Sequence, residues 1–285
     1  MGFFSWLFRK KPKKLTLGLA LGSGGAKGFA EIGALRAFEE NGIEFDIVAG
    51  TSIGSIVGAF YANGYSSNDM FELLKKMDFT QFFSLSKIIN IDTSVIHDVV
   101  DDAIGSLNIE ELKKPYKCVA TVVETGDEYV FDKGSVATAV CASSCIPPFF
   151  KPVVIDDVRY VDGAFSNSIP ADLVKQMGAD YIVGIDLKDY EPKQSGILGK
   201  LFPTYKGKVA EPWAKGYEYS NVVLHPDLRG YSSVSFNSGS EMYDIGYKTA
   251  IEHMPQIKEQ INALMKNNIP QSSDIRDLLC TQFIF

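Results

Sequence analysis

The chain has 285 residues, of which 46% are hydrophobic and 22% charged, a composition suited to a globular protein with one large core or two smaller ones. No apolar run approaches the ~18 residues that a membrane-spanning helix needs. The net charge is −7, and because the basic cluster at residues 9–14 contributes +5, the rest of the chain carries −12, which argues against nucleic acid as a partner.

Residues 1–14 combine aromatic side chains with that basic cluster. A secretory signal would place its charges before a longer apolar part, and the myristoylation pattern needs Ser or Thr where Trp6 stands. One interpretation is membrane contact, with the apolar residues in the interface and the cations at anionic head groups. The other is that the segment packs on the protein or on a second subunit, or is disordered. The sequence thus predicts a cytoplasmic protein, with peripheral contact at the inner face of the membrane under the first interpretation.

Two strand-to-helix units with glycine-bearing turns follow. Residues 15–21 are apolar at nearly every position, as in a strand buried on both faces, and lead into the stretch 22–28, GSGGAKG. Apolar residues then recur at helical spacing. A second short strand at 47–49 leads into the stretch 50–54, GTSIG, and another helical pattern follows. This repeat favours a parallel α/β sheet.

The middle of the chain alternates between the two patterns. The sequence predicts helices at 69–77 (capped by Ser67), 95–104, 135–144 and 171–177, and strands at 116–123, 128–131, 153–161 (a pair turned at Asp156-Asp157) and 181–186. The apolar, irregular stretch 79–91 either lines an acyl pocket or fills core.

The remainder is less regular. Residues 189–217 carry three prolines and four glycines, which predicts a long irregular connection of the kind that forms lids or flaps. A strand at 221–224 and a helical region at 240–267, interrupted by Pro255, come next. We therefore expect one catalytic domain over residues 15–271, preceded by the segment 1–14 and followed by a tail at 272–285.

The four cysteines show no metal-binding spacing. Cys118, Cys141, Cys145 and Cys280 fit packing positions in a reducing compartment.

A serine between two glycines on a strand-to-helix turn is the arrangement of a nucleophile elbow, and Ser52 holds that place. Backbone N–H groups around Gly24 and Gly25 could then bind an oxyanion. Serine is a weak nucleophile until a base takes its proton. His225 and His253 follow Ser52 in the order of an α/β-hydrolase triad, but neither lies in a glycine-framed loop.

Asp162 has better surroundings than the histidines. It ends an apolar strand, and the small residues Gly163 and Ala164 leave space beside it. A carboxylate there could accept the serine proton directly, since burial would raise its pKa from ~3.9 and make it a stronger base. Taken alone, Asp162-Gly163 is also the pattern of a plain turn.

The glycine stretch 22–28 has two rival interpretations. A dinucleotide fingerprint needs glycine at the sixth position, where Lys27 stands, and a phosphate-binding P-loop needs Gly-Lys followed by Ser or Thr. Neither pattern is met.

Taken together, these stretches resemble the patatin-like phospholipases over about residues 15–190. Residues 21–30 resemble the family's glycine-rich oxyanion loop, 50–54 its nucleophile motif and 162–164 its Asp-Gly-Ala/Gly motif, while 142–150 and 167–170 match in style and spacing. Three positions depart from the family pattern. Ser23 replaces the usual glycine, Glu31 stands where related bacterial members often carry histidine, and Lys27 replaces the commoner arginine but keeps its charge.

The resemblance implies a three-layer α/β/α fold with a mainly parallel central sheet, and hydrolysis of lipid acyl esters through an acyl-Ser52 intermediate. It implies a Ser52–Asp162 dyad without catalytic histidine, obligatory metal or other cofactor, acting on phospholipid or another acyl-ester lipid. The remaining site residues it implies are Gly24, Gly25, Ala26 and Lys27 at the oxyanion hole, supported by Gly22, Gly28, Gly50, Gly54, Gly163 and Ala164. Two alternatives stay open: a soluble esterase or thioesterase, and a non-catalytic lipid- or nucleotide-binding module with the same fold.

Overall fold

The computed structural model describes residues 14–76, 92–188 and 211–267. Two compact units can be separated: Thr16–His253, and a second made of Met1–Leu15 and Met254–Phe285. The fold below is that of Thr16–His253. Most of the segment 1–14, all of 79–91 and 272–285, and residues 189–210 of the predicted irregular connection lie outside the described residues, so the membrane contact, acyl pocket and lid expected there stay predictions.

An eight-stranded sheet, counted over the described residues, forms the centre of this unit, in the order β5-β6-β3-β2-β1-β7-β8 with β4 also paired to β3. The pairs β1–β2, β1–β7, β2–β3 and β7–β8 are parallel, and β3–β4, β3–β6 and β5–β6 are antiparallel. The predicted α/β class is therefore confirmed, with a parallel centre and an antiparallel extension at one edge. The strands are β1 Leu17–Leu21, β2 Ile47–Thr51, β3 Tyr116–Val122, β4 Glu128–Phe131, β5 Val153–Ile155, β6 Val158–Asp162, β7 Tyr181–Ile185 and β8 Val222–Leu224.

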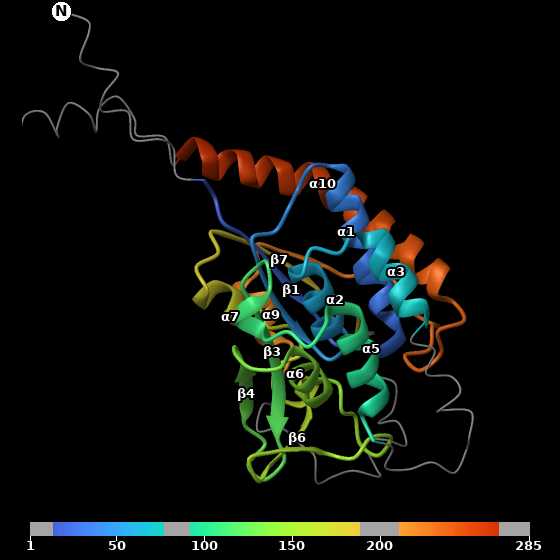
Figure 1. The fold of residues 1–285 in the computed structure, drawn as a ribbon. Helices are drawn as coiled ribbons and strands as arrows, with labels where there is room; N and C mark the ends of the chain where they lie inside the picture. The colour runs from blue at the N-terminus through green and yellow to red at the C-terminus, as the bar shows by residue number, and fades with distance from the viewer. Residues whose placement is uncertain (1–13, 77–91, 189–210, 268–285) are drawn as a thin grey trace, which may run out of the picture. The chain divides into compact units, whose positions relative to one another are not determined.

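Helices cover both faces of the sheet (Figure 1). On one face α2 (Ile53–Ala62) and α6 (Val136–Ser143) pack on the strands, and α1 (Gly28–Glu40), α3 (Ser67–Lys76) and α5 (Ser94–Ile104) pack on those two helices or on each other. On the other face lie α7 (Ala171–Gln176) and α9 (Ala214–Tyr219). Strands β2 and β7 are buried at every position, as their continuous apolar runs predict for a sheet covered on both sides.

Three parallel strands end side by side. Leu21 at the end of β1 is in register with Gly50 of β2 and with Ile185 at the end of β7. Because parallel strands present their carboxyl ends at one edge of the sheet, the segments that follow β1, β2 and β7 meet there. Short 3-10 turns, η1 (Gly25–Lys27) and η3 (Gly163–Phe165), carry two of the predicted motifs, and η2 (Ile109–Glu111) precedes β3.

Three expectations about element boundaries need correction. The end of the predicted irregular connection forms the helix α9, because apolar and small residues there pack on α7. The helix α10 (Gly239–Asn267) runs through Pro255 without interruption, since a proline removes only one hydrogen bond of a long helix. The cap of α3 is Ser66, whose Oγ accepts from the Asp69 amide at 3.2 Å, and Ser67 is the first helical residue.

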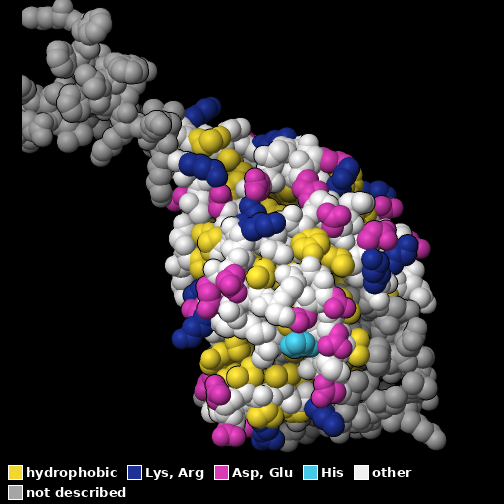
Figure 2. Space-filling view, viewed as in Figure 1, with side chains coloured by type: hydrophobic (Ala, Val, Ile, Leu, Met, Phe, Trp, Pro, Cys, Tyr) yellow, Lys and Arg dark blue, Asp and Glu magenta, His cyan; other side chains and the backbone are white. Residues whose placement is uncertain are grey.

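No helix within the described residues is both long and apolar enough to cross a membrane. On the face seen in Figure 2, acidic and basic side chains are interspersed, with small groups of apolar side chains between them. The three cysteines that lie in the described part of the chain are buried and unbridged.

Helices α1 and α10 approach each other closely through glycines. A Cβ built on Gly246 would lie 1.9 Å from the carbonyl oxygen of Ala30, and one on Gly33 would lie 1.9 Å from that of Tyr243. Both contacts are to backbone atoms, which cannot rotate away. This approach places α1, the helix that follows the glycine loop, against the unit's own part of α10.

We expect Gly246→Ala to destabilise the fold. Alanine favours a helix by roughly 1 kcal/mol over glycine, but overpacking at a backbone contact costs about 1–3 kcal/mol, so the net change is a loss. Urea unfolding of Gly246→Ala against the exposed control Asp244→Ala measures it. A Gly246→Ala protein as stable as the wild type would contradict the close approach of the two helices.

Candidate active site

Ser52 lies on a sharp turn between β2 and α2. Its backbone has φ 57° and ψ −125°, a conformation that is costly for a residue with a side chain. The neighbouring glycines allow the turn, because a Cβ on Gly50 would lie 2.1 Å from the Gly54 carbonyl oxygen. The first turn of α2 is thereby pressed against the end of β2, and the serine is the residue that projects from the turn.

The Ser52 hydroxyl donates a hydrogen bond to Asp162, with 2.6 Å between Oγ and Oδ2. The two residues are 110 positions apart in sequence, and both are buried, at 3% and 1% exposure. Asp162 is the last residue of β6, and its other oxygen, Oδ1, accepts from the Ala164 amide at 2.8 Å. The carboxylate is therefore fixed on both oxygens, with one directed at the serine.

Burial raises the pKa of Asp162 to about 6, while the hydrogen bonds from Ser52 and Ala164 and the positive charge of Lys188 lower it. A carboxylate in this range is a stronger proton acceptor than an exposed aspartate and is still mostly ionised at neutral pH. The environment thus gives Asp162 the two properties that a general base needs.

The backbone amides of the glycine loop differ in whether they are already engaged. Within the described residues, the amides of Gly24 and Gly25 donate to no acceptor. The Ala26 amide donates to the Ser233 carbonyl at 2.8 Å, and the Lys27 amide to the Gly24 carbonyl at 3.3 Å. Of the four predicted oxyanion donors, Gly24 and Gly25 are therefore the two whose N–H groups can donate to a ligand without breaking an existing hydrogen bond.

The supporting glycines occupy tight places. A Cβ built on any of these glycines would lie within 2.5 Å of another atom. The glycines are Gly22, Gly28, Gly50, Gly54 and Gly163. The last of the predicted supporting residues, Ala164, contributes its amide to Asp162.

A cavity of about 500 Å³ contains these groups. Ser52, Asp162 and the loop residues Gly24 to Lys27 all line it. Most of the rest of the lining is apolar: Ile53, Ile56, Ile96, Ile146, Phe149, Phe150, Ala164, Phe165, Leu187, Val234 and Phe236. The predicted catalytic and oxyanion residues are thus brought together in one apolar hollow.

The histidines lie elsewhere. All three are among the described residues, and none lines the cavity. The ring of His253 contacts the Thr249 carbonyl at 2.8 Å, and His225 Nδ1 lies 3.9 Å from Asp186 Oδ2. In the described part of the chain, no group of three or more metal-ligand side chains is placed to hold a metal ion.

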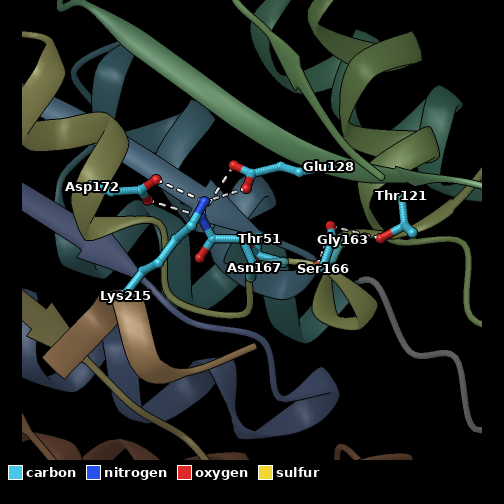
Figure 3. Close-up of polar contacts among 8 residues, drawn as sticks. All are labelled: Thr51, Thr121, Glu128, Gly163, Ser166, Asn167, Asp172 and Lys215. Carbon is cyan, nitrogen blue, oxygen red and sulfur yellow. Dashed lines mark hydrogen bonds and ion pairs between the residues drawn. The ribbon is translucent and has the colours of Figure 1, made fainter. Parts of the chain in front are cut away.

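A buried polar network supports the turn from the other side (Figure 3). Thr51 Oγ1 donates to the Asn167 carbonyl at 2.8 Å. The Asn167 side-chain amide donates to Asp172 at 2.8 Å and to Glu128 at 3.1 Å, and the Lys215 ammonium joins both carboxylates, at 2.9 Å and 2.5 Å. The residue before Ser52 is therefore tied to an ion-pair cluster through Asn167.

A second branch of the network holds the aspartate strand. Thr121 Oγ1 donates to the Asp162 carbonyl at 3.0 Å. It also lies 2.9 Å from Ser166 Oγ, which contacts the Gly163 carbonyl (Figure 3). The backbones of Ser52 and Asp162 thus have separate polar supports.

Sequence reasoning missed several residues of the site. Ser143 Oγ accepts the Ser52 amide at 2.9 Å, and Lys188 and Ser233 line the cavity. Lys188 carried a usable signal, because it follows a parallel strand at the edge where the other motifs lie. Ser233 carried none, since it lies in an irregular segment brought to the glycine loop only by the tertiary fold.

Comparison with known proteins identifies similar chains. A sequence model of the family described as "Patatin-like phospholipase" matches residues 19–175. The chain is 28% identical over 277 residues to patatin-like phospholipase domain-containing protein 6 of Mus musculus, covering 82% of this chain and 20% of that protein. It is 27% identical over 299 residues to lysophospholipase NTE1 of Pyricularia oryzae, covering 91% and 20%. The chain therefore spans about a fifth of the length of these curated relatives.

A solved structure shares the fold. VipD from Legionella pneumophila matches with a TM-score of 0.55 and 13% identity, over 86% of this chain and 67% of VipD. The predicted fold class is borne out by this likeness.

Glu31 is a buried carboxyl group next to the glycine loop. It has no exposed surface, and neither of its oxygens has a hydrogen-bond partner among the described residues. Burial raises the pKa of Glu31 well above the usual 4.5. The nearby backbone of Gly22 lowers this pKa by a smaller amount, although it does not form a hydrogen bond to the carboxyl group. Burial therefore favours the protonated, neutral form of Glu31 in the folded protein.

We expect the contribution of Glu31 to wild-type stability to fall as the pH rises above about 4.5, and Glu31→Gln to remove that part of the pH dependence. Below this pH the carboxyl is neutral in both states; above it, only the unfolded chain releases the proton, until the pH reaches the folded pKa. Glutamine is neutral throughout, so the variant gains stability relative to wild type between about pH 5 and pH 8. Urea unfolding at both pH values tests this, with exposed Glu72→Gln as control. Equal pH dependence in wild type and Glu31→Gln would contradict a neutral Glu31.

Proposed function

Because the chain belongs to the patatin-like phospholipase family, we propose that it hydrolyses carboxylic esters of lipids, with Ser52 as nucleophile and Asp162 as general base. The observation that carries this proposal is the 2.6 Å hydrogen bond between the Ser52 hydroxyl and a buried carboxylate, inside an apolar cavity that also holds two unengaged amides.

In the first half-reaction, Asp162 Oδ2 accepts the hydroxyl proton as Ser52 Oγ bonds to the ester carbonyl carbon. The negative charge that develops on the carbonyl oxygen is met by the amides of Gly24 and Gly25, at the start of α1 where the helix dipole adds positive potential. When the tetrahedral intermediate collapses, the proton on Asp162 passes to the departing alkoxide, and Ser52 keeps the acyl group.

In the second half-reaction, water takes the place of the alcohol. Asp162 accepts a proton from that water as its oxygen attacks the acyl carbonyl carbon, and the same amides hold the oxyanion. Collapse releases the fatty acid and returns the proton to Ser52 Oγ. Asp162 therefore accepts and returns a proton in both half-reactions. A moderately raised pKa favours both transfers, because the carboxylate is then a stronger base and its protonated form is still a usable acid.

The cavity supports an acyl substrate. Its isoleucine and phenylalanine side chains present apolar surface directly beside Ser52, and burial of each methylene of an acyl chain there contributes about 0.8 kcal/mol. Hydrolysis of phospholipid or lysophospholipid esters is part of this proposal, and the similarity to a patatin-like phospholipase domain protein and to a lysophospholipase supports it.

We expect Ser52→Ala and Asp162→Asn each to lower kcat/KM for a neutral p-nitrophenyl ester by about 10³-fold or more. The first variant removes the attacking oxygen and the second the proton acceptor, and the replacement side chains fit the same space. A fluorophosphonate probe, with the labelled site mapped by mass spectrometry, should mark Ser52 in the wild type and not in Ser52→Ala.

The matched controls are Ser106→Ala and Asp102→Asn, at exposed positions, which should keep wild-type rates. Thermal unfolding establishes that each variant is folded. Full ester hydrolysis by Ser52→Ala, or a folded wild type whose Ser52 stays unlabelled while it binds lipid, would reject the proposal in favour of a non-catalytic module.

The pH profile follows from the environment of Asp162. Because the pKa of Asp162 is about 6, its carboxyl group is protonated and inactive as a base below this pH and ionised above it. We therefore expect kcat/KM to rise through about pH 6 and level off by about pH 8. His225→Gln should keep the same rise; its disappearance in that variant would identify an imidazole as the base instead.

A further inference from the structure

Few ionisable side chains line the cavity. Among the described residues that line it, the ionisable side chains are Lys27, Lys188 and Asp162. Lys188 is the cation whose charge acts on Asp162, and that carboxylate already accepts hydrogen bonds from a serine hydroxyl and a backbone amide. The surrounding side chains are mostly apolar, so the positive charge is weakly screened inside the cavity.

Lys188 is placed by the end of β7. Its backbone amide donates to Asp186 Oδ1 at 3.0 Å, and its ammonium nitrogen lies 5.7 Å from the centre of the Trp213 ring, a cation–π distance. The first contact fixes the backbone of Lys188. The second holds the ammonium group near the Trp213 ring and leaves its positive charge in place.

No carboxylate of the described chain lies within 4 Å of the Lys188 ammonium. Its two negative neighbours act at longer range: burial lowers the pKa of Lys188, and the charges of Asp186 and Asp162 raise it in return. Asp186 is itself occupied, since its Oδ2 accepts from the Tyr217 hydroxyl at 3.0 Å. A largely buried ammonium with no ion pair is costly, and an anionic ligand in the cavity would offset that cost.

A plainer role is that Lys188 only adjusts the pKa of Asp162. That role explains the longer-range charge effect and predicts the same change for every ester, whereas direct ligand binding predicts a change that depends on the charge of the substrate. A phosphodiester oxygen is an acceptor well matched to an ammonium group, and charge-assisted hydrogen bonds of this kind are stronger than neutral ones.

We propose that Lys188 binds the anionic phosphodiester group of a phosphate-bearing acyl ester, and so selects such substrates over neutral esters with the same acyl chain. The inference rests on the proposed function, because it assigns a selectivity to the same cavity. The glycerol backbone of a lysophospholipid joins the scissile ester to the phosphodiester, and Ser52 and Lys188 line the same cavity.

The test is a selectivity ratio measured on the full chain. For wild type, Lys188→Met, Lys188→Arg and the exposed control Lys133→Met, kcat/KM is determined for a 1-acyl-glycerophosphocholine and for the 1-monoacylglycerol with the same acyl chain. Assays at about pH 8 keep Asp162 ionised in every variant. We expect the ratio of the two kcat/KM values to fall about tenfold in Lys188→Met, chiefly through KM, to be largely retained in Lys188→Arg, and to be unchanged in Lys133→Met.

The outcomes separate the inference from the function it rests on. An equal loss on both substrates in Lys188→Met would assign the residue to the dyad or the fold and overturn the inference, as would an unchanged ratio. In either case, hydrolysis of both esters by the wild type would leave the proposed function standing. A wild type that hydrolyses neither ester would remove both.

Discussion

The hydrogen bond between Ser52 and Asp162 is the interaction around which the rest of the structure is arranged. Its carboxylate is buried, and the rise of its pKa from 3.8 to about 6 corresponds to roughly 3 kcal/mol of lost stability at neutral pH. The turn at Ser52 adds backbone strain. Without support, the strained backbone of Ser52 and the buried carboxylate of Asp162 would move to less costly positions. The surrounding fold must therefore hold both residues in place.

Two sets of contacts provide this support. The parallel strands β1, β2 and β7 fix where the chain turns, and glycines in those turns let backbones approach more closely than any side chain would allow. The polar network built on Asn167, Asp172, Glu128 and Lys215 holds Thr51 from the opposite side of the sheet. The site is therefore braced by hydrogen bonds to backbone carbonyls, which keep their geometry better than contacts between flexible side chains do.

Much of this arrangement could be predicted from the sequence, because it depends on local patterns. Apolar runs before glycine stretches located β1 and β2, and a serine between glycines marked the turn at residue 52. Pairing Ser52 with Asp162 needed more, since nothing local in Asp162-Gly163 distinguishes it from an ordinary turn, and the family resemblance supplied it. The contacts of Ser143, Lys188 and Ser233 depend on how distant segments pack, and single-sequence patterns carry little information about that. Pro255 misled the prediction because helix breaking by proline depends on tertiary context.

The contact between the Ala26 amide and the Ser233 carbonyl has a consequence for substrate entry. At 2.8 Å, a peptide oxygen of the protein already rests on the glycine loop, in the manner of a ligand. An ester oxygen that is to accept a hydrogen bond from this amide has to displace the Ser233 carbonyl, whose chain neighbours Val234 and Phe236 line the cavity. A carbonyl of the protein's own chain thus occupies the Ala26 amide, and a ligand gains this hydrogen-bond donor only by displacing that carbonyl.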